Sequence, residues 1–330
     1  MIRHLQLALL ALFLPAAASA EGWRHAPSGI AIAELPDGFR VGTESDGRRD
    51  GSDVVVQLGD AEDAATLYVY RSAFPNPALW FERTRLAMRV NVGAPIDSVA
   101  PRSFTLGNAA APNGLREEIA IPPGNRFRST AVAMAQNGEW MIKLRITSTT
   151  LDLAGITAKM DGLLAAIGLP AGAPAPLPLV VPAPCPDANA MRGRQRPQSM
   201  ENSLLGVLAI LEAHNDARGR SGLAAEPANW CRETSRFPVE QVAVYRRRDG
   251  KVWTALLGDA GMAVSAYMSG DPQLPGAMTY AANPSVTGLA LIYDAMPAPN
   301  EAVEPALPFL VGRAQSSVSI NASENRRDRR

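Results

Sequence analysis

The chain has 330 residues, of which 47% are hydrophobic and 19% are charged, a composition that excludes a disordered or collagen-like protein. Its 32 basic and 32 acidic residues give a formal net charge of +0, so no overall field favours nucleic acid. Three histidines and two cysteines leave little material for metal or nucleophile chemistry. Composition therefore restricts the possible functions and names none of them.

The first twenty residues have the pattern of an export signal. Arg3 and His4 form a short positive start, residues 5–14 form an apolar core, and Ala18-Ser19-Ala20 is a small-residue cleavage site. This core is half of the roughly 20 residues that cross a bilayer. We expect cleavage near Ala20, a mature chain without a transmembrane segment, and a periplasmic or secreted location in a bacterial envelope.

A proline-rich segment divides the rest of the chain. In residues 170–186, seven of seventeen residues are Pro, which lacks an amide hydrogen and fixes φ, so the run favours an extended, semi-rigid spacer. We therefore predict a first domain over residues 21–169, a linker over 170–186, and a second, smaller domain over 187–320. A basic, disordered tail is expected over residues 321–330.

Strand patterns surround one helix in the first domain. Asn76-Pro77 predicts a helix start, because Asn caps free amides and Pro is tolerated at the first helical position. Gly93 would end this helix, and Leu79, Leu86 and Val90 would form its apolar side. The strand patterns are at residues 30–32, 39–41, 54–58, 66–70, 102–106 and 115–121.

The clearest hairpin covers residues 127–147. It would turn at Asn137-Gly138, since both residues accept the positive φ of a type I′ turn. The expected cross-strand pairs are Ala135 with Trp140, Ala133 with Ile142, Ala131 with Leu144, and Ser129 with Ile146. A final helix would carry one apolar stripe of Leu153, Ile156, Met160, Leu163 and Ile167.

The short connections between these strands cannot make parallel crossovers, so we predict an α+β fold with a mostly antiparallel sheet flanked by helices. The element order, the start Leu35-Pro36-Asp37-Gly38-Phe39, and the hairpin Asn137-Gly138-Glu139-Trp140 with Arg145 resemble the PsbP/Mog1-like α/β/α sandwich over about residues 27–169. The resemblance implies a partner-binding or assembly module rather than an enzyme, and no site residue of the family can be carried over.

The second domain is also predicted to be α+β. Residues 200–218 have helical spacing behind Ser199 as a cap, and residues 239–258 form a hairpin around Asp249-Gly250. Further strand patterns are at residues 262–268, 278–281, 286–293 and 318–320.

The chain contains none of the common catalytic or nucleotide-binding motifs, such as the P-loop, G-x-S-x-G or H-E-x-x-H. A zinc site needs three or four ligands, and His25, His214, Cys185 and Cys231 include no close pair. His214 with Asp216 could form half of a catalytic base pair, but we favour a helix-end histidine that interacts with the helix dipole.

Two acidic features do not predict a site. Residues 46–53 resemble a calcium loop at positions one, five and six, but Arg48 stands at position three and Gln57 at position twelve, so a solvated connection is expected. Glu117 and Glu118 would point to opposite faces of a strand, which excludes a catalytic dyad. We therefore predict no catalytic, cofactor-binding or metal-binding residues.

The two cysteines favour a disulfide. Export would place Cys185 and Cys231 in an oxidising compartment, where two cysteines in one domain suit a single bridge. A pair of free thiols, one of them buried, is the alternative.

The hairpin around Asp249-Gly250 would gather positive charge at its tip. A two-residue turn pairs Arg246 with Trp253 and brings together Arg246, Arg247, Arg248 and Lys251. Our hypothesis is that these cations and Trp253 contact an anionic partner, such as phospholipid headgroups, envelope polysaccharide or an acidic protein patch. The alternative is a charged hairpin that keeps its edge from pairing with other strands.

Two classes of function remain. We favour an exported, noncatalytic envelope protein that acts as a binding or assembly module for a protein or an anionic envelope partner. The alternative is an exported enzyme of unrecognised type, such as a hydrolase whose Ser, His and Asp meet only in three dimensions. No cofactor and no nucleic-acid partner are expected.

Overall fold

The computed structural model describes most of the chain between residues 22 and 310. The described ranges are 22–36, 38–47, 52–59, 62–93, 97–170, 179–186, 191–197, 208, 229–258, 261–268, 276–282 and 288–310. Several predicted features lie outside them: the export signal, the helix at 200–218 apart from residue 208, Arg48, His214, Asp216, the strand at 318–320 and the tail.

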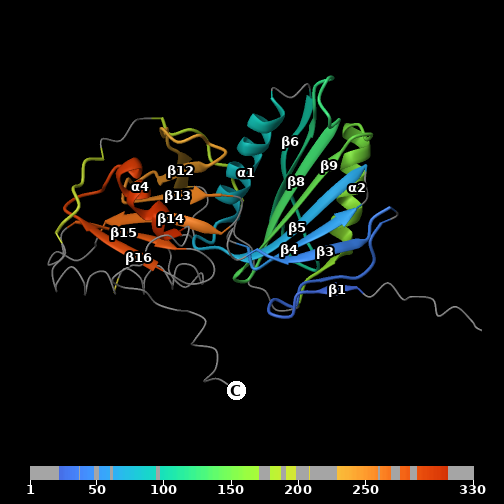
Figure 1. Ribbon diagram of the computed structural model, residues 1–330, viewed down its shortest axis with the longest axis horizontal. Helices are drawn as coiled ribbons and strands as arrows, with labels where there is room; N and C mark the ends of the chain where they lie inside the picture. The colour runs from blue at the N-terminus through green and yellow to red at the C-terminus, as the bar shows by residue number, and fades with distance from the viewer. Residues whose placement is uncertain are drawn as a thin grey trace, which may run out of the picture.

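A seven-stranded sheet dominates the first half of the chain (Figure 1). Its strands, in spatial order, are β3 (Val41–Asp46), β4 (Val54–Gly59), β5 (Asp63–Arg71), β9 (Trp140–Ser148), β8 (Ser129–Asn137), β7 (Gly114–Ala120) and β6 (Asp97–Phe104). Every neighbouring pair is antiparallel. The predicted α+β class with mostly antiparallel sheets is therefore confirmed.

The hairpin of β8 and β9 has a register different from the predicted one. Asn137 stays in the strand and pairs with Trp140, so the turn is Gly138-Glu139, with φ of 61° at Gly138. The observed pairs are Ala135 with Ile142, Ala133 with Leu144, Ala131 with Ile146, and Ser129 with Ser148. Each partner moves by two residues, so every side chain keeps its predicted face.

Helix α1 (Pro77–Val92) begins at the predicted residue. Asn76 Oδ1 accepts hydrogen bonds from the backbone N–H groups of Ala78 and Leu79 at 3.1 and 3.2 Å. Gly93 follows the helix with φ of 76°, a conformation that favours glycine. Local sequence is thus sufficient to set both ends of α1.

The buried side of α1 was predicted only in part: Leu79 is buried and Leu86 is half-buried, as expected. Val90 is 54% exposed, whereas Trp80, Phe81 and even Arg83 are buried. In Figure 1, α1 lies between the seven-stranded sheet and the strands of the second half. A helix covered on two faces has no single apolar stripe, so its periodicity does not reveal which side is buried.

Helix α2 (Leu153–Ala166) covers the other face of the seven-stranded sheet. Asp152 caps it by accepting a hydrogen bond from the Gly155 N–H at 2.8 Å. Ile156, Met160 and Leu163 are buried in the core against the sheet. A small sheet of β1 (Trp23–Arg24), β2 (Ala31–Ile32) and β10 (Ile167–Gly168) contributes to the same core.

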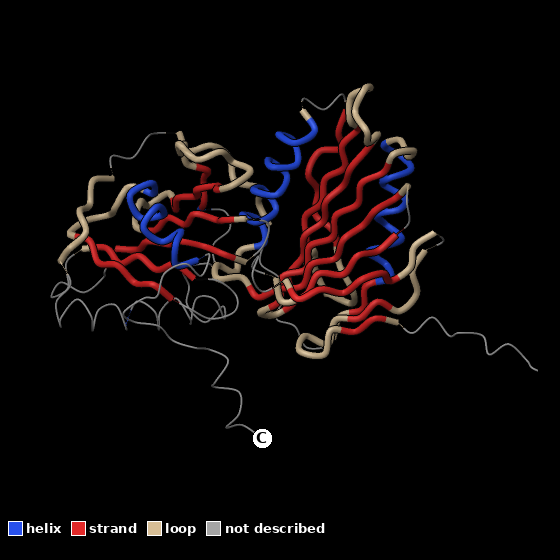
Figure 2. Tube along the Cα trace, in the orientation of Figure 1, coloured by secondary structure: helices blue, strands red, loops and turns tan. Residues whose placement is uncertain are grey.

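The second half contains a six-stranded antiparallel sheet. In order, its strands are β11 (Trp230–Arg232), β12 (Val242–Arg247), β13 (Val252–Leu257), β14 (Met262–Met268), β15 (Ala277–Ala282) and β16 (Gly288–Tyr293). Helix α4 (Pro299–Leu310) packs on one face through Ala302, Val303 and Ala306 (Figure 2). Strand β11 and helix α4 were not predicted from the sequence; Pro305 and Pro308 inside α4 obscure its helical pattern.

Extended segments pair with both edges of the six-stranded sheet. At the β11 edge, the Cys185 N–H donates to the Arg232 carbonyl and the Arg232 N–H donates to the Ala183 carbonyl, both at 2.8 Å. At the β16 edge, the Arg196 N–H donates to the Ile292 carbonyl at 2.8 Å. Part of the proline-rich segment therefore belongs to the sheet, where it satisfies edge groups that would otherwise be open to other strands.

The two halves share one hydrophobic core. Tyr70 and Trp80 of the first half belong to the same buried cluster as Trp230 and Tyr245 of the second. The Ala73 N–H also donates to the Gly261 carbonyl at 2.9 Å. Packing of this kind fixes the two sheets against α1.

A buried carboxylate on α1 connects the halves as well. Glu82, 1% exposed, accepts a hydrogen bond from the Tyr245 hydroxyl at 2.6 Å and pairs with Arg232 at 2.5 Å. Burial raises the pKa of Glu82, although the Tyr245 hydrogen bond and the Arg232 charge both lower it. Burial also raises the pKa of Tyr245 well above its usual range, so this phenol keeps its proton and donates.

Two further carboxylates fasten the helices to the sheet. Glu117 pairs with Arg85 and Arg89 of α1, the first at 3.1 Å. Glu118 pairs with Arg116 at 2.9 Å, and Arg116 also pairs with Asp161 of α2. The two neighbouring carboxylates thus serve opposite faces of the sheet, as predicted, and each is fully buried with arginine partners.

The raised pKa of Glu82 predicts how stability depends on pH. A carboxyl whose pKa is higher in the folded than in the unfolded protein destabilises the fold as pH rises from about 4.5, its ordinary value, through the folded pKa. We expect the free energy of unfolding of the natural protein, minus that of Glu82→Gln, to fall over this interval and then level off. Urea unfolding of both proteins across pH measures the difference. A difference that rises with pH would mean that Arg232 and Tyr245 outweigh burial.

The disulfide supplies a second stability prediction. Cys185 and Cys231 are bonded, with their Cα atoms 4.9 Å apart and a sequence separation of 46. Closing a loop of this length stabilises the fold by about 4 kcal/mol in the chain-entropy model, which is an upper figure. We expect the double variant Cys185→Ser, Cys231→Ser to lose up to this amount in urea unfolding. Two alkylatable thiols in the native, unreduced protein would contradict the bridge.

Candidate functional site

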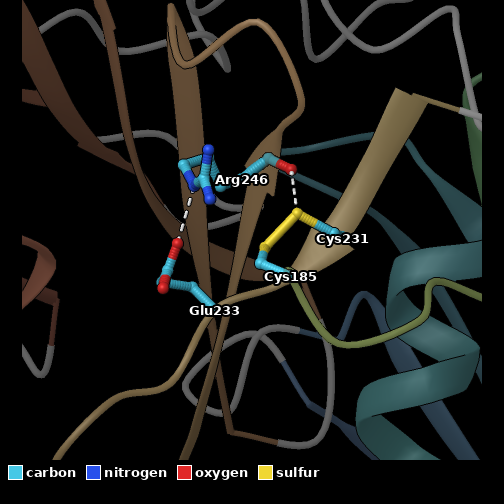
Figure 3. The surroundings of a disulfide bond; sticks show 4 residues. All are labelled: Cys185, Cys231, Glu233 and Arg246. Atoms are coloured by element: carbon cyan, nitrogen blue, oxygen red, sulfur yellow. Dashed lines mark hydrogen bonds and ion pairs between the residues drawn. A yellow bond between two sulfur atoms is a disulfide. The ribbon is translucent and has the colours of Figure 1, made fainter. Parts of the chain in front are cut away.

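Only some of the residues predicted to form a binding surface at the tip of the β12–β13 hairpin are exposed. Arg246 pairs with Trp253 as predicted, but the two side chains are 4% and 0% exposed, so the expectation that they contact a partner is wrong. Arg246 Nε donates to Glu233 at 2.7 Å, beside the Cys185–Cys231 disulfide (Figure 3). Strand β11 covers β12 on this side, and its residues are distant from the hairpin in sequence.

The disulfide and Trp253 anchor this region instead. Cys231 Sγ lies 3.5 Å from the Arg246 carbonyl, a packing contact rather than a hydrogen bond because a disulfide sulfur carries no proton. The Trp253 indole N–H donates to the Pro297 carbonyl at 3.0 Å, next to α4. The disulfide and the Trp253 side chain therefore stabilise the fold here rather than form a binding surface.

Three cations remain at the tip, and one of them is neutralised. Arg247 pairs with Asp249 at 2.7 Å, and this hydrogen bond lowers the pKa of Asp249. Arg248 and Lys251 are exposed. The tip thus offers two exposed positive charges rather than a basic patch with an aromatic ring, and an anionic contact there stays a prediction for Arg247, Arg248 and Lys251.

A larger feature lies on the far side of the seven-stranded sheet. A groove of about 1090 Å³ runs between the start of α2 and the ends of β6 and β7. We call it the α2 groove; its apolar lining residues include Val99, Ile121, Pro122, Phe127, Leu153 and Ala158, and they contribute more of its surface than the polar residues do. The groove is therefore mostly apolar.

The sequence of α2 explains one wall of the groove. Ile156, Met160 and Leu163 of α2 face the sheet, and positions 154, 157, 158 and 161 carry small or polar side chains that line the groove. These positions follow the spacing of one helical face. Ala154 and Ala158 are exposed, so α2 presents a smooth, low surface to the groove.

The other wall is the loop between β7 and β8. The Ile121 N–H donates to the Arg128 carbonyl at 2.8 Å, which closes the loop at its base. Phe127 is 37% exposed at the mouth of the groove, and the Arg126 guanidinium lies 5.2 Å from its ring centroid. A tethered loop thus presents a large apolar side chain beside a positive charge.

The acidic residues around the α2 groove interact with other groups of the protein, whereas its basic residues are exposed. Asp152 is engaged in capping α2, and Asp161 pairs with Arg116. Arg126 and Arg128 are exposed, and Arg128 donates one hydrogen bond to the Thr150 carbonyl at 3.1 Å. The mouth of the groove therefore favours a negatively charged group.

The histidine and the possible metal ligands considered in the sequence do not form a site in the described part of the chain. His25 is buried, its Nδ1 lies 2.8 Å from Ser28 Oγ, and burial lowers its pKa. Within the described ranges, no cluster of three or more His, Cys, Asp or Glu side chains could hold a metal ion. None of the helices in those ranges is long and apolar enough to span a bilayer.

Sequence reasoning missed the α2 groove. Arg126-Phe127-Arg128 follows a Pro-Pro-Gly-Asn turn at 122–125, so a large apolar residue stands between cations beside a loop signal. That pattern was read only as the start of the hairpin. The opposing wall on α2 lies about thirty residues further along, and no local pattern reports their approach.

Comparison with known proteins adds a weak likeness of fold. No family model matches the chain, and no curated protein matches it. The solution structure of cyanobacterial PsbP (CyanoP) from Synechocystis sp. PCC 6803 is 10% identical, and the alignment covers 49% of this chain and 99% of that chain with a TM-score of 0.33. This is a weak resemblance at the level of the fold, and it carries no argument about function.

Proposed function

We propose that the protein is an exported, noncatalytic binding module and that the α2 groove receives an extended segment of a partner protein. The observation that carries the proposal is Phe127, which remains 37% exposed at the mouth of a mostly apolar groove. Large apolar side chains in such positions are typical anchors of protein interfaces. The Cys185–Cys231 disulfide supports export, because disulfides persist in oxidising compartments.

The size of the groove favours a peptide over a small molecule. Its volume of about 1090 Å³ is slightly above the range of ligand pockets, which is about 300–1,000 Å³. Strand addition to the neighbouring edge strand β6 is disfavoured, because Pro101 and a register shift between Val99 and Arg102 interrupt its ladder. The partner segment would therefore lie in the groove rather than extend the sheet.

The exposed charges define the chemistry of the partner. Arg126 and Arg128 stand at the mouth, while the nearby carboxylates of Asp152 and Asp161 are engaged within the protein. An apolar side chain beside Phe127 and an acidic side chain beside the two arginines would match both features. The partner is thus an apolar and acidic segment, which fits the expectation of a protein partner with negative charge.

Photo-crosslinking tests this assignment. A benzophenone amino acid in place of the exposed Ala158 should give a discrete protein adduct in envelope preparations. Phe127→Ala should reduce the adduct yield about tenfold or more, since burying a Phe side chain contributes roughly 1.5–3 kcal/mol. Raised salt should weaken the adduct of the natural protein, because exposed arginines contribute to binding.

The same crosslinker at Val90 is the matched control. Val90 is also exposed on a helix but lies on α1, outside the groove. Equal adducts at positions 90 and 158, or an adduct at 158 that Phe127→Ala leaves unchanged, would remove the α2 groove as the binding surface. Thermal melts of each variant confirm that the fold survives.

A further inference from the structure

His25 lies in a turn that attaches the short strand β1 to the rest of the first half. This turn covers residues 25–30 and is closed by two backbone hydrogen bonds of 2.8 Å. The His25 N–H donates to the Ile30 carbonyl, and the Gly29 N–H donates to the His25 carbonyl. Strand β1 pairs with β2 over two residues. Because so short a ladder is weak, the attachment of β1 depends on the side chains around the turn.

Two tryptophan rings pack against the imidazole of His25. The Trp23 ring of β1 stacks on it with the centroids 6.2 Å apart, and the Trp140 ring of β9 meets it edgewise with the centroids 5.1 Å apart. Trp23 is held in turn by Glu44 of β3, which accepts its indole N–H at 2.8 Å. His25 and both rings are buried. These mostly apolar surroundings favour the neutral form of the imidazole.

The Ser28 hydroxyl determines which nitrogen of His25 carries the ring proton. Ser28 Oγ lies 2.8 Å from His25 Nδ1 and accepts the Ile30 N–H at 3.1 Å. The alternative acceptor for the hydroxyl, the His25 carbonyl, is 3.5 Å away and already accepts the Gly29 N–H. The hydroxyl therefore donates to Nδ1, and the ring proton is on Nε2. A second proton on the ring must go to Nδ1, which forces the hydroxyl to turn toward the more distant carbonyl.

Charged side chains of neighbouring elements act on His25 in both directions. Within the described ranges, the carboxylates of Asp53 and Glu44 favour a protonated ring, and the Arg71 guanidinium of β5 opposes it. Both carboxylates have other partners, because Asp53 pairs with Arg71 at 3.8 Å and Glu44 accepts from Trp23. Burial is the largest effect, and it lowers the pKa of His25 below its ordinary value of 6.5.

We propose that the turn at residues 25–30 is an acid-sensitive latch, in which protonation of His25 turns the Ser28 hydroxyl away and releases β1 from β2. A charged ring is costly to keep among the tryptophan side chains, so the open turn, where water solvates the ring, takes up the proton. The latch is therefore closed above pH 6.5 and opens progressively as the pH falls below it. Release gives β2 an open edge, to which another strand can pair, while β10 keeps its other edge.

Amide hydrogen exchange of the mature chain, followed by NMR and corrected for the intrinsic pH dependence of exchange, tests the latch. The His25 N–H reports on it directly, because its hydrogen bond to the Ile30 carbonyl is lost when the turn opens. Since opening takes up one proton, the protection factor should fall by up to about tenfold per pH unit below 6.5. The Ile121 N–H, which donates to the Arg128 carbonyl in the loop between β7 and β8, is the internal control and should show no such fall.

Two variants separate the latch from a general sensitivity to acid. His25→Gln has no ring to protonate, so the N–H at position 25 should keep a constant protection factor over the same range. Asp53→Asn removes a carboxylate that favours the charged ring, so the protection factor should fall further than in the natural protein, and this comparison decides the question even where His25→Gln does not fold. Protection in the natural protein that stays constant or rises on acidification would overturn the proposal, as would an equal fall in His25→Gln or a smaller fall in Asp53→Asn.

Discussion

The burial of α1 between two sheets is the constraint on which the rest of the structure depends. A helix in this position must place its polar side chains against partners on both sides. Glu82 meets Tyr245 and Arg232 of the second half, and Glu117 of the seven-stranded sheet meets arginines on α1. Breaking one such partner leaves a buried charge uncompensated, which costs more than the pair itself contributes. The relative position of the two sheets therefore depends on a few ionic contacts as well as on apolar packing.

Local sequence patterns were sufficient to predict where helices and hairpins begin and end. They were not sufficient to predict which of their side chains are buried. The Asn76 cap and Gly93 set α1, and Asp249-Gly250 sets the pairing of Arg246 with Trp253. The exposure of Val90 and the burial of Arg246 could not be predicted, because each depends on strands distant in sequence. The turn at Gly138-Glu139 differs from prediction for a smaller reason: Asn137 can occupy either the turn or the strand.

The candidate sites were harder to predict than the fold, since each is built from segments that meet only after folding. The α2 groove joins residues 121–128 to α2, and a cavity of about 210 Å³ joins α1, β5 and β9 to residues of the second half. Within the cavity, Lys143 and Arg145 alternate with the apolar Ile142 and Leu144 along β9. That alternation predicts a strand with one polar face, and in an ordinary sheet this face would be exposed to solvent. Here the second half covers part of it.

The formal net charge of zero does not mean that charged residues are evenly distributed in the fold. The buried carboxylates Glu117 and Glu118 each have two arginine partners, so the arginines around them are compensated. Arg126 and Arg128 at the α2 groove, by contrast, are exposed. The α2 groove and this cavity lie on opposite faces of the seven-stranded sheet. They share no lining residue, although each is lined by two arginines. Substitutions at one should then add to those at the other without coupling, unless ligand binding shifts the sheet that separates them.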